Sequence, residues 1–427
     1  MTIRFHDAWE AGKRIVLGAR EGRLEKAGKV VLVRDVTGRL NLAVENKIEP
    51  EARRSLLADL SEAMGPFLAE GVLEAPDLFA RDAVFATSDA VPLGARDVWR
   101  LDRVVTGAEW VRAALPNEPP RPPRATLFGV KGGVGRSTAI CVWSWHLATR
   151  GKKVLVVDLD LEAPGVSSML LSSGAEPDYG LVDWLVEDAV GNADDELGRM
   201  MIAQSSLADG TPGQILVAPC GGTQGTHEYT DKLARAYVDI PTRHGLRTFA
   251  GRVAALVDHL ERITAPDVVL IDSRSGIHDL AAIATVRLGT VSFLFAVDTR
   301  QTWDAYRILL SSWSRRPQAA HRIRAQLQMV AAQVPETHRV EYLARTQQRS
   351  YDLFADTLYE EAAPDDTNAF NFDVLAAEAP HYPLPVYWSR AMQAWEPTEG
   401  AVSYAELQGL YGEFLRRATD LVVGDEV

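Results

Sequence analysis

Residues 128–139 read FGVKGGVGRSTA, a glycine-rich stretch that separates two apolar segments. Residues 125–128, at its start, have the composition of a short buried strand, and residues 140–147 form the mostly apolar pattern of a helix. Glycines allow successive backbone N–H groups to converge on one point, and a helix N-terminus adds partial positive charge there. A strand, a glycine-rich turn and a helix in this order predict a phosphate-binding loop.

The loop is similar to the pattern Gly-x-x-x-x-Gly-Lys-Ser/Thr. Gly129 and Gly135 supply two glycines, with five residues between them where the pattern has four, and Arg136 stands where the pattern has lysine. In such loops the lysine contacts the β- and γ-phosphates and the hydroxyl contacts magnesium, so Ser137 is the predicted magnesium ligand. A second cation, Lys131, lies early in the loop. The alternative interpretation is a glycine-rich turn that carries two cations by chance.

Two later apolar segments end in aspartate. Residues 153–158 (KVLVVD) lead into Asp158 and Asp160, and residues 268–272 (VVLID) end at Asp272. Carboxylates at the C-terminal ends of parallel strands lie where ligands bind in such sheets. An apolar strand that ends in aspartate downstream of a phosphate loop is the Walker B arrangement, in which the carboxylate reaches the magnesium shell.

A run of prolines divides the chain. Five of the eight residues 116–123 (PNEPPRPP) are proline, a composition that supports neither a helix nor a central strand. We predict a small α/β docking or regulatory domain at residues 1–115, a linker at 116–124 and a nucleotide-binding domain at 125–427. Strands and helices alternate in the last part, which predicts an α/β fold with a doubly wound, mostly parallel sheet flanked by helices.

The glycine-rich loop, residues 158–165 and residues 268–276 together resemble the motifs of the ParA/MinD ATPases. The loop is similar to the variant of their deviant Walker A motif (KGGVGR) that has arginine at its end. The resemblance runs from about residue 126 to residue 418 and leaves the N-terminal residues outside. It implies a P-loop ATPase fold, ATP and Mg²⁺ as ligands, and a homodimer that forms with ATP.

The resemblance also implies roles for individual residues. In the family the early lysine, here Lys131, reaches the phosphates of the partner subunit, and the second aspartate, here Asp160, orients the attacking water. Arg136 joins these two as a residue expected to act in catalysis. The expected magnesium ligands are Ser137, Asp158 and Asp272.

Contacts with the base are implied more weakly. Gln333 stands where the family often has a base-contacting asparagine, and Pro385 begins a segment similar to the family's proline-containing loop near the adenine. The full set of expected nucleotide-binding residues is Gly132, Gly133, Val134, Gly135, Arg136, Ser137, Thr138, Gln333 and Pro385.

Two residues depart from the family's pattern. Arginine is longer than lysine and ends in a planar fork of donors. Arg136 therefore either binds the β- and γ-oxygens bidentately or permits nucleotide binding with slow hydrolysis. Arg274 occupies a position where the family more often has a small residue or proline. It follows Asp272 closely enough to contact a γ-phosphate, and a salt bridge within its own segment is the alternative.

The composition fits a soluble globular protein, with 47% apolar and 24% charged residues among 427. No window approaches the roughly 18 uncharged apolar residues of a membrane span, and the N-terminus lacks the apolar core of a signal peptide. Only two cysteines occur, Cys141 and Cys220, which fits a reducing compartment. We therefore expect a cytoplasmic protein without a membrane partner.

The net charge is −13, and the acidic surplus lies after residue 115. Non-specific DNA binding depends on neutralising phosphates with Lys and Arg, so nucleic acid is not the expected partner. The basic stretch at residues 315–324 keeps a partition-like nucleic-acid-binding ATPase open as an alternative.

The resemblance predicts an ATP-driven switch that dimerises with ATP and hydrolyses it to ADP and phosphate, slowly without a partner. An unidentified protein partner would bind through the N-terminal domain. The competing interpretation is a nucleotide-binding signalling module with little or no turnover, in which Arg136 is tolerated because binding alone is the signal.

Overall fold

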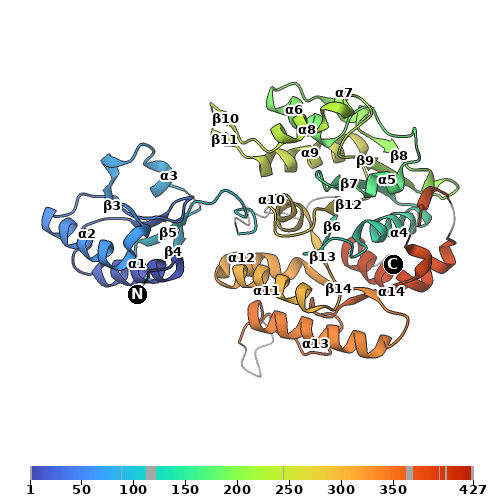
Figure 1. Ribbon diagram of the computed structural model, residues 1–427. Coiled ribbons are helices and arrows are strands. Elements are labelled where there is room, and N and C mark those ends of the chain that lie inside the picture. The colour runs from blue at the N-terminus through green and yellow to red at the C-terminus, as the bar shows by residue number, and fades with distance from the viewer. Residues whose placement is uncertain are drawn as a thin grey trace. The chain divides into compact units, whose positions relative to one another are not determined.

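A computed structural model describes residues 2–87, 89–111, 122–243, 245–361, 369–393, 395–399 and 402–424 (Figure 1). The chain divides into two compact units, Met1–Ala108 and Glu109–Val427. The predicted linker at residues 116–124 falls mostly outside the described residues, so its limits remain a prediction.

The first unit is a mixed five-stranded sheet with helices on both faces. Helices α1 (Phe5–Ala19) and α2 (Pro50–Met64) share one core with the sheet, and α3 (Asp82–Phe85) contributes to a smaller core on the opposite face. The strand order is β3 (Leu68–Glu74), β2 (Leu40–Val44), β1 (Val30–Arg34), β5 (Val98–Asp102) and β4 (Val91–Pro92).

The second unit is built on an eight-stranded sheet. Its order is β15 (Leu384–Tyr387), β14 (Leu327–Val334), β13 (Val291–Ala296), β6 (Arg124–Phe128), β12 (Val268–Ser273), β7 (Lys153–Leu159), β9 (Gln214–Ala218) and β8 (Ala203–Gln204). All neighbouring strands are parallel except β8, which runs antiparallel to β9. The predicted mostly parallel α/β sheet and the separate small α/β unit are confirmed.

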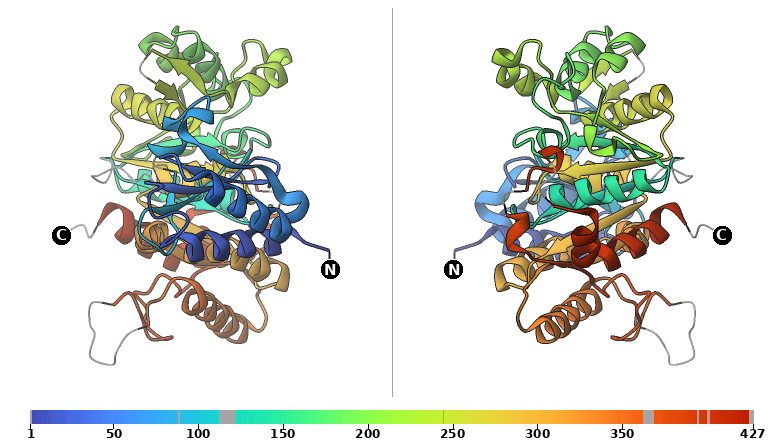
Figure 2. Two further views of the ribbon diagram at one scale, coloured as in Figure 1. Left: turned by 90° about the vertical axis from the view of Figure 1, so that its left-hand side faces the viewer. Right: turned by 90° about the vertical axis from the view of Figure 1, so that its right-hand side faces the viewer.

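Helices cover both faces of this sheet, which is why its strands are almost continuously apolar. Along β7, Val154 and Val156 belong to one core, whereas Leu155 and Val157 belong to another on the opposite face. The first core includes α4 (Arg136–Thr149), α5 (Val166–Leu170) and α14 (Tyr404–Val423), and Figure 2 shows α4 and α14 on the same side. The other face carries α6 (Leu181–Ala189), α8 (Tyr229–Ala236), α9 (Phe249–Thr264), α11 (Arg300–Ser314), α12 (Pro317–Ile323) and α13 (Arg339–Thr357).

The segment just before the proline run packs in the second unit. The Trp110 ring is 2% exposed and lies 5.3 Å from the ring of Phe128 and 6.0 Å from that of Trp313, between ring centroids. Trp313 also donates its indole N–H to the Trp110 carbonyl at 2.6 Å. Residues 109–111 are therefore part of the core around β6, the strand that leads into the glycine-rich loop.

The remaining short elements are α7 (Asp195–Met200), α10 (Asp279–Ala282) and a hairpin of β10 (Ile240–Thr242) and β11 (Gly245–Arg247). Within the described ranges, every helix is too short or too polar to cross a membrane. Both cysteines are buried and free.

Candidate functional site

The glycine-rich loop connects the C-terminal end of β6 to the first residue of α4. Gly133 and Gly135 have φ angles of 72° and 88°, values that glycine adopts without strain. A Cβ atom at either position would meet no atom within 4 Å, so the space beside both glycines is open. The first N–H groups of α4 have no partner within the helix. The predicted loop thus has the backbone geometry of an anion cradle.

A serine and an aspartate meet at the start of α4. The hydroxyl of Ser137 donates to Oδ2 of Asp272 at 2.6 Å. Parallel pairing brings them together, because Asp272, one residue before the end of β12, lies opposite Leu127 of the neighbouring β6. The other carboxylate oxygen of Asp272 is buried and has no hydrogen-bond partner among the described residues.

Two more aspartates lie at the same edge of the sheet. Asp158 stands opposite Asp272 in the register of β7 and β12, and it accepts hydrogen bonds from the amide and hydroxyl of Ser167. Asp160 follows two residues later and is 8% exposed. Its Oδ1 is buried and, in the part of the chain that the structure describes, unpaired.

Burial dominates the electrostatics of these carboxylates. It raises the pKa of Asp272 to about 7 and the pKa of Asp160 to about 6, although the charge of Arg136 lowers both. Burial also raises the pKa of Asp158, against the hydrogen bonds from Ser167. Three buried acids with raised pKa values favour a cation at this edge, because a positive charge would stabilise their ionised forms.

Arg136 turns toward these acids. Its side chain is 7% exposed, donates to the carbonyl of Ser273 and lies 3.8 Å from Oδ2 of Asp160. Lys131, by contrast, is exposed. Across the residues described, Lys131 has neither an ion pair nor a side-chain hydrogen bond. The two cations of the loop therefore differ: one neutralises the acidic edge, and the other faces solvent.

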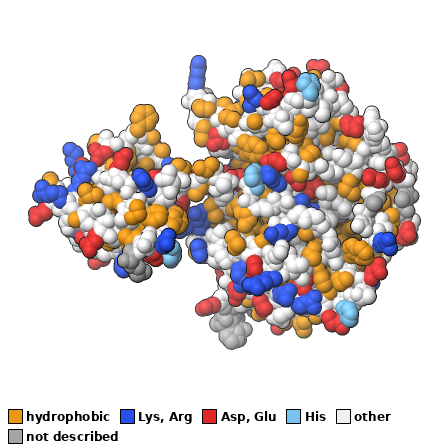
Figure 3. All heavy atoms as spheres, viewed as in Figure 1, with side chains coloured by type: hydrophobic (Ala, Val, Ile, Leu, Met, Phe, Trp, Pro, Cys, Tyr) orange, Lys and Arg blue, Asp and Glu red, His pale blue; other side chains and the backbone are white. Residues whose placement is uncertain are grey.

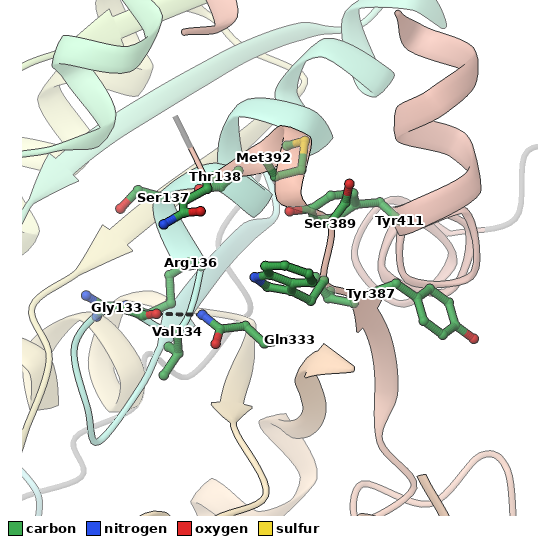
Figure 4. A pocket seen from close by; sticks show the side chains of 14 residues that line it. Gly133, Val134, Arg136, Ser137, Thr138, Gln333, Tyr387, Ser389, Met392 and Tyr411 are labelled. Atoms are coloured by element: carbon green, nitrogen blue, oxygen red, sulfur yellow. Dashed lines mark hydrogen bonds between the residues drawn. The ribbon is translucent and has the colours of Figure 1, made fainter. Parts of the chain in front are cut away.

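A pocket of about 370 Å³ extends from the loop (Figure 4). Gln333 lies on its wall, and its side-chain amide donates to the Gly133 carbonyl at 2.6 Å. The φ angle of Gln333 is 53°, which is uncommon for a residue other than glycine. The lining residues are Gly133, Val134, Gly135, Arg136, Ser137, Thr138, Gln333, Val386, Tyr387, Trp388, Ser389, Met392, Gln393 and Tyr411.

The wall opposite the loop comes from the exit of β15. Pro385 itself is buried in that strand opposite Ala331 and is not among the lining residues, whereas residues 386–389 are. The sequence did not identify residues 386–389 individually as lining residues, and it did not identify Tyr411 of α14. The only signal was the weak similarity of the segment that follows Pro385.

The expected magnesium ligands are brought together, but they do not form a complete cage. No group of three or more His, Cys, Asp or Glu residues that could hold a metal occurs among the residues described. Magnesium usually keeps several waters and binds one or two carboxylates together with substrate phosphates. Ser137 and the unpartnered oxygen of Asp272, beside a phosphate cradle, fit that chemistry.

Arg274 follows the Walker B strand and is engaged elsewhere. Its guanidinium forms an ion pair with Glu162, which lies just after Asp160. Arg274 thus forms a salt bridge, but its partner comes from the segment after β7, so the expected alternative of a salt bridge within its own segment is not what the structure shows.

No protein-family model matches the chain, and a comparison with curated proteins finds no match. Similar solved structures include a ParA family ATPase from Chlorobium tepidum TLS, with 13% identity, a TM-score of 0.44 and coverage of 69% of this chain and 98% of that one. MinD from Pyrococcus horikoshii OT3 complexed with Mg-ADP has 17% identity, a TM-score of 0.44 and coverage of 71% and 99%. pNOB8 ParA bound to nonspecific DNA has 17% identity, a TM-score of 0.43 and coverage of 70% of this chain and 97% of that one. At such low identity these likenesses assign no function, which has to come from the chain's own residues.

The raised pKa of Asp272 makes stability depend on pH. The folded chain keeps this proton up to a pH of about 7, whereas an unfolded chain loses it near 3.8, so the free energy of unfolding falls as pH rises between these values. Asp272→Asn removes this contribution. From pH 5 to pH 8 the variant should gain at least about 1 kcal/mol of stability relative to wild type, since one pKa unit corresponds to about 1.4 kcal/mol.

Urea unfolding of the second unit in EDTA, at both pH values, measures this difference. Asp209→Asn, at an exposed position, is the control and should show no pH-dependent gain. An equal pH dependence for wild type and Asp272→Asn would show that Asp272 is ionised in the folded chain.

Proposed function

We propose that this chain binds ATP with Mg²⁺ and acts as a slow ATPase switch whose ATP-bound form is a homodimer. The observation that carries the proposal is the contact of the Ser137 hydroxyl with Asp272 at the N-terminus of α4, directly after the glycine-rich loop. Polyphosphate binding needs a cradle of N–H groups and a cation held beside it. Both requirements meet at this position.

Magnesium would be held by Ser137 and Asp272, with Asp158 supporting from β7. When bound, the ion supplies charge neutralisation for the phosphate oxygens. The carboxylate oxygen of Asp272 that lacks a partner supports this role, because a buried unpaired oxygen needs a cation or a hydrogen-bond donor. Ser167 keeps Asp158 oriented through two hydrogen bonds.

Asp160 is the residue proposed to orient water toward the terminal phosphate. Its Oδ1 has no partner within the described chain and can accept a hydrogen bond from that water. Arg136 lies 3.8 Å from its other oxygen. Since Arg136 would be shared between Asp160 and the phosphates, we expect slow hydrolysis of ATP. The alternative is a module that binds the nucleotide without hydrolysing it.

Lys131 is proposed to reach the phosphates bound by a second subunit. It is exposed, and within the described residues no carboxylate neutralises it. A cation supplied in trans stabilises the charge of phosphoryl transfer, as an arginine finger does. Dimerisation would then depend on the nucleotide, because without phosphates a lysine approaching a positively charged loop is repelled. An unidentified protein partner would bind through the N-terminal unit.

Nucleic-acid binding receives little support from the second unit. Figure 3 shows Lys and Arg side chains interspersed with acidic side chains on this face of the second unit. Arg324, the last residue of the basic stretch at residues 315–324, is buried and forms an ion pair with Glu360 at 2.9 Å, so its charge is neutralised within the fold.

Ser137→Ala should weaken binding of Mg-ATP by at least about tenfold, because it removes a ligand of the ion while leaving the loop's N–H groups in place. Isothermal titration calorimetry of the full chain, with and without magnesium, measures this. Ser314→Ala, at an exposed position of α11, should bind as the wild type does. If Ser137→Ala and wild type bound Mg-ATP with equal affinity, Ser137 would not be a magnesium ligand.

The mass of the protein in solution, measured with and without nucleotide, tests whether ATP causes dimerisation. With ATP and magnesium, light scattering should show a dimer that is longest lived in Asp160→Ala, because hydrolysis no longer ends the ATP-bound state. Lys131→Ala should remain a monomer, whereas the exposed Lys47→Ala should dimerise normally. A monomer in both wild type and Asp160→Ala would contradict the dimer model.

A further inference from the structure

The segment after the Walker B strand lies against the phosphate loop. The amide of Gly276 donates to the carbonyl of Gly129 at 3.1 Å. The Ser275 hydroxyl lies 3.6 Å from the place where a Cβ atom of Gly132 would be. Arg274 belongs to this segment, so its backbone is fixed beside the loop that would hold the phosphates.

The guanidinium of Arg274 is held by an acidic side chain from the segment that follows β7. Glu162 pairs with it, and the hydroxyl of Tyr237 donates to the same carboxylate oxygen, Oε1. The Tyr237 ring is fixed in turn against Phe249, with centroids 4.6 Å apart. Glu162 therefore has two donors, one from the Walker B side and one from the end of α8.

The charges of this pair act on Asp160. Burial is the main cause that raises the pKa of Asp160, but the charge of Arg274 lowers that pKa and the charge of Glu162 raises it. Both side chains are partly exposed, at 31% for Arg274 and 25% for Glu162. An ion pair with that much solvent access is weak and exchanges partners readily.

We propose that Arg274 is an arginine finger supplied in cis. It stays paired with Glu162 until a terminal phosphate takes the place of the Glu162 carboxylate. Arginine binds carboxylate and phosphate with the same planar fork, so the γ-phosphate competes directly with Glu162. The Tyr237 hydroxyl remains as a donor to Glu162 after Arg274 leaves, so the carboxylate keeps one hydrogen-bond partner. Arg274 thereby distinguishes a nucleoside triphosphate from a diphosphate. This inference rests on the proposed function.

The ratio of affinities for a non-hydrolysable ATP analogue and for ADP, measured by calorimetry on the full chain with magnesium, tests the proposal. Arg274→Ala should lower this ratio at least tenfold while ADP binding stays unchanged, which also shows that the variant is folded. Glu162→Gln should raise the ratio about threefold or more, because it removes the competitor. Tyr237→Phe should lower the ratio, because Glu162 then has no donor once Arg274 leaves.

The double variant Glu162→Gln, Arg274→Ala should match Arg274→Ala alone, since Glu162 acts only through Arg274. Arg262→Ala, which removes a surface arginine paired with Asp195, is the matched control and should leave the ratio unchanged. An unchanged ratio in Arg274→Ala, or an effect of Glu162→Gln that persists without Arg274, would overturn the inference while the proposed function stands. Failure of the wild type to bind either nucleotide would overturn both.

Discussion

The constraint on which the site depends is the burial of three carboxylates at one edge of a parallel sheet. Strand pairing sets Asp158 opposite Asp272, and Asp160 follows at the end of β7. Unpaired buried charge is unfavourable, so the pKa values of these acids are raised. A divalent ion shared with phosphate oxygens would relieve this penalty, and in the proposed function the glycine-rich loop would hold those phosphates beside the carboxylates.

Two arginines supply part of the missing charge in the structure. Arg136 reaches Asp160 and the carbonyl of Ser273, contacts that a lysine ammonium could make only in part because it lacks the planar fork. Arg274 pairs with Glu162 next to Asp160. Both arginines thus bind groups that phosphate oxygens resemble. In the proposed function, exchange of carboxylate for phosphate would link nucleotide occupancy to the arrangement of the segments that follow β7 and β12.

Sequence reasoning predicted the parts of the site that follow from local pattern and strand direction. Ser137 could be placed near Asp272 because a glycine-rich loop fixes the start of a helix, and parallel strands end at one edge. The α/β class followed from the alternation of apolar segments. The residues of the pocket wall at 386–389 could not be predicted individually, since they come from a distant segment that shows only a weak similarity to a known motif. The choice of Glu162 as the partner of Arg274 depends on side-chain packing around Tyr237, which no spacing encodes.

Proton release on ligand binding measures whether a bound cation relieves the burial of the three carboxylates. Calorimetric titration of Mg-ATP into the chain at pH 6.5, with excess magnesium and in buffers of different ionisation enthalpy, counts the protons that the buried carboxylates lose when a cation binds. We expect binding with net release of protons, and a smaller release in Asp272→Asn. Binding without any proton release, or no binding at millimolar ligand, would contradict a cation site at these carboxylates.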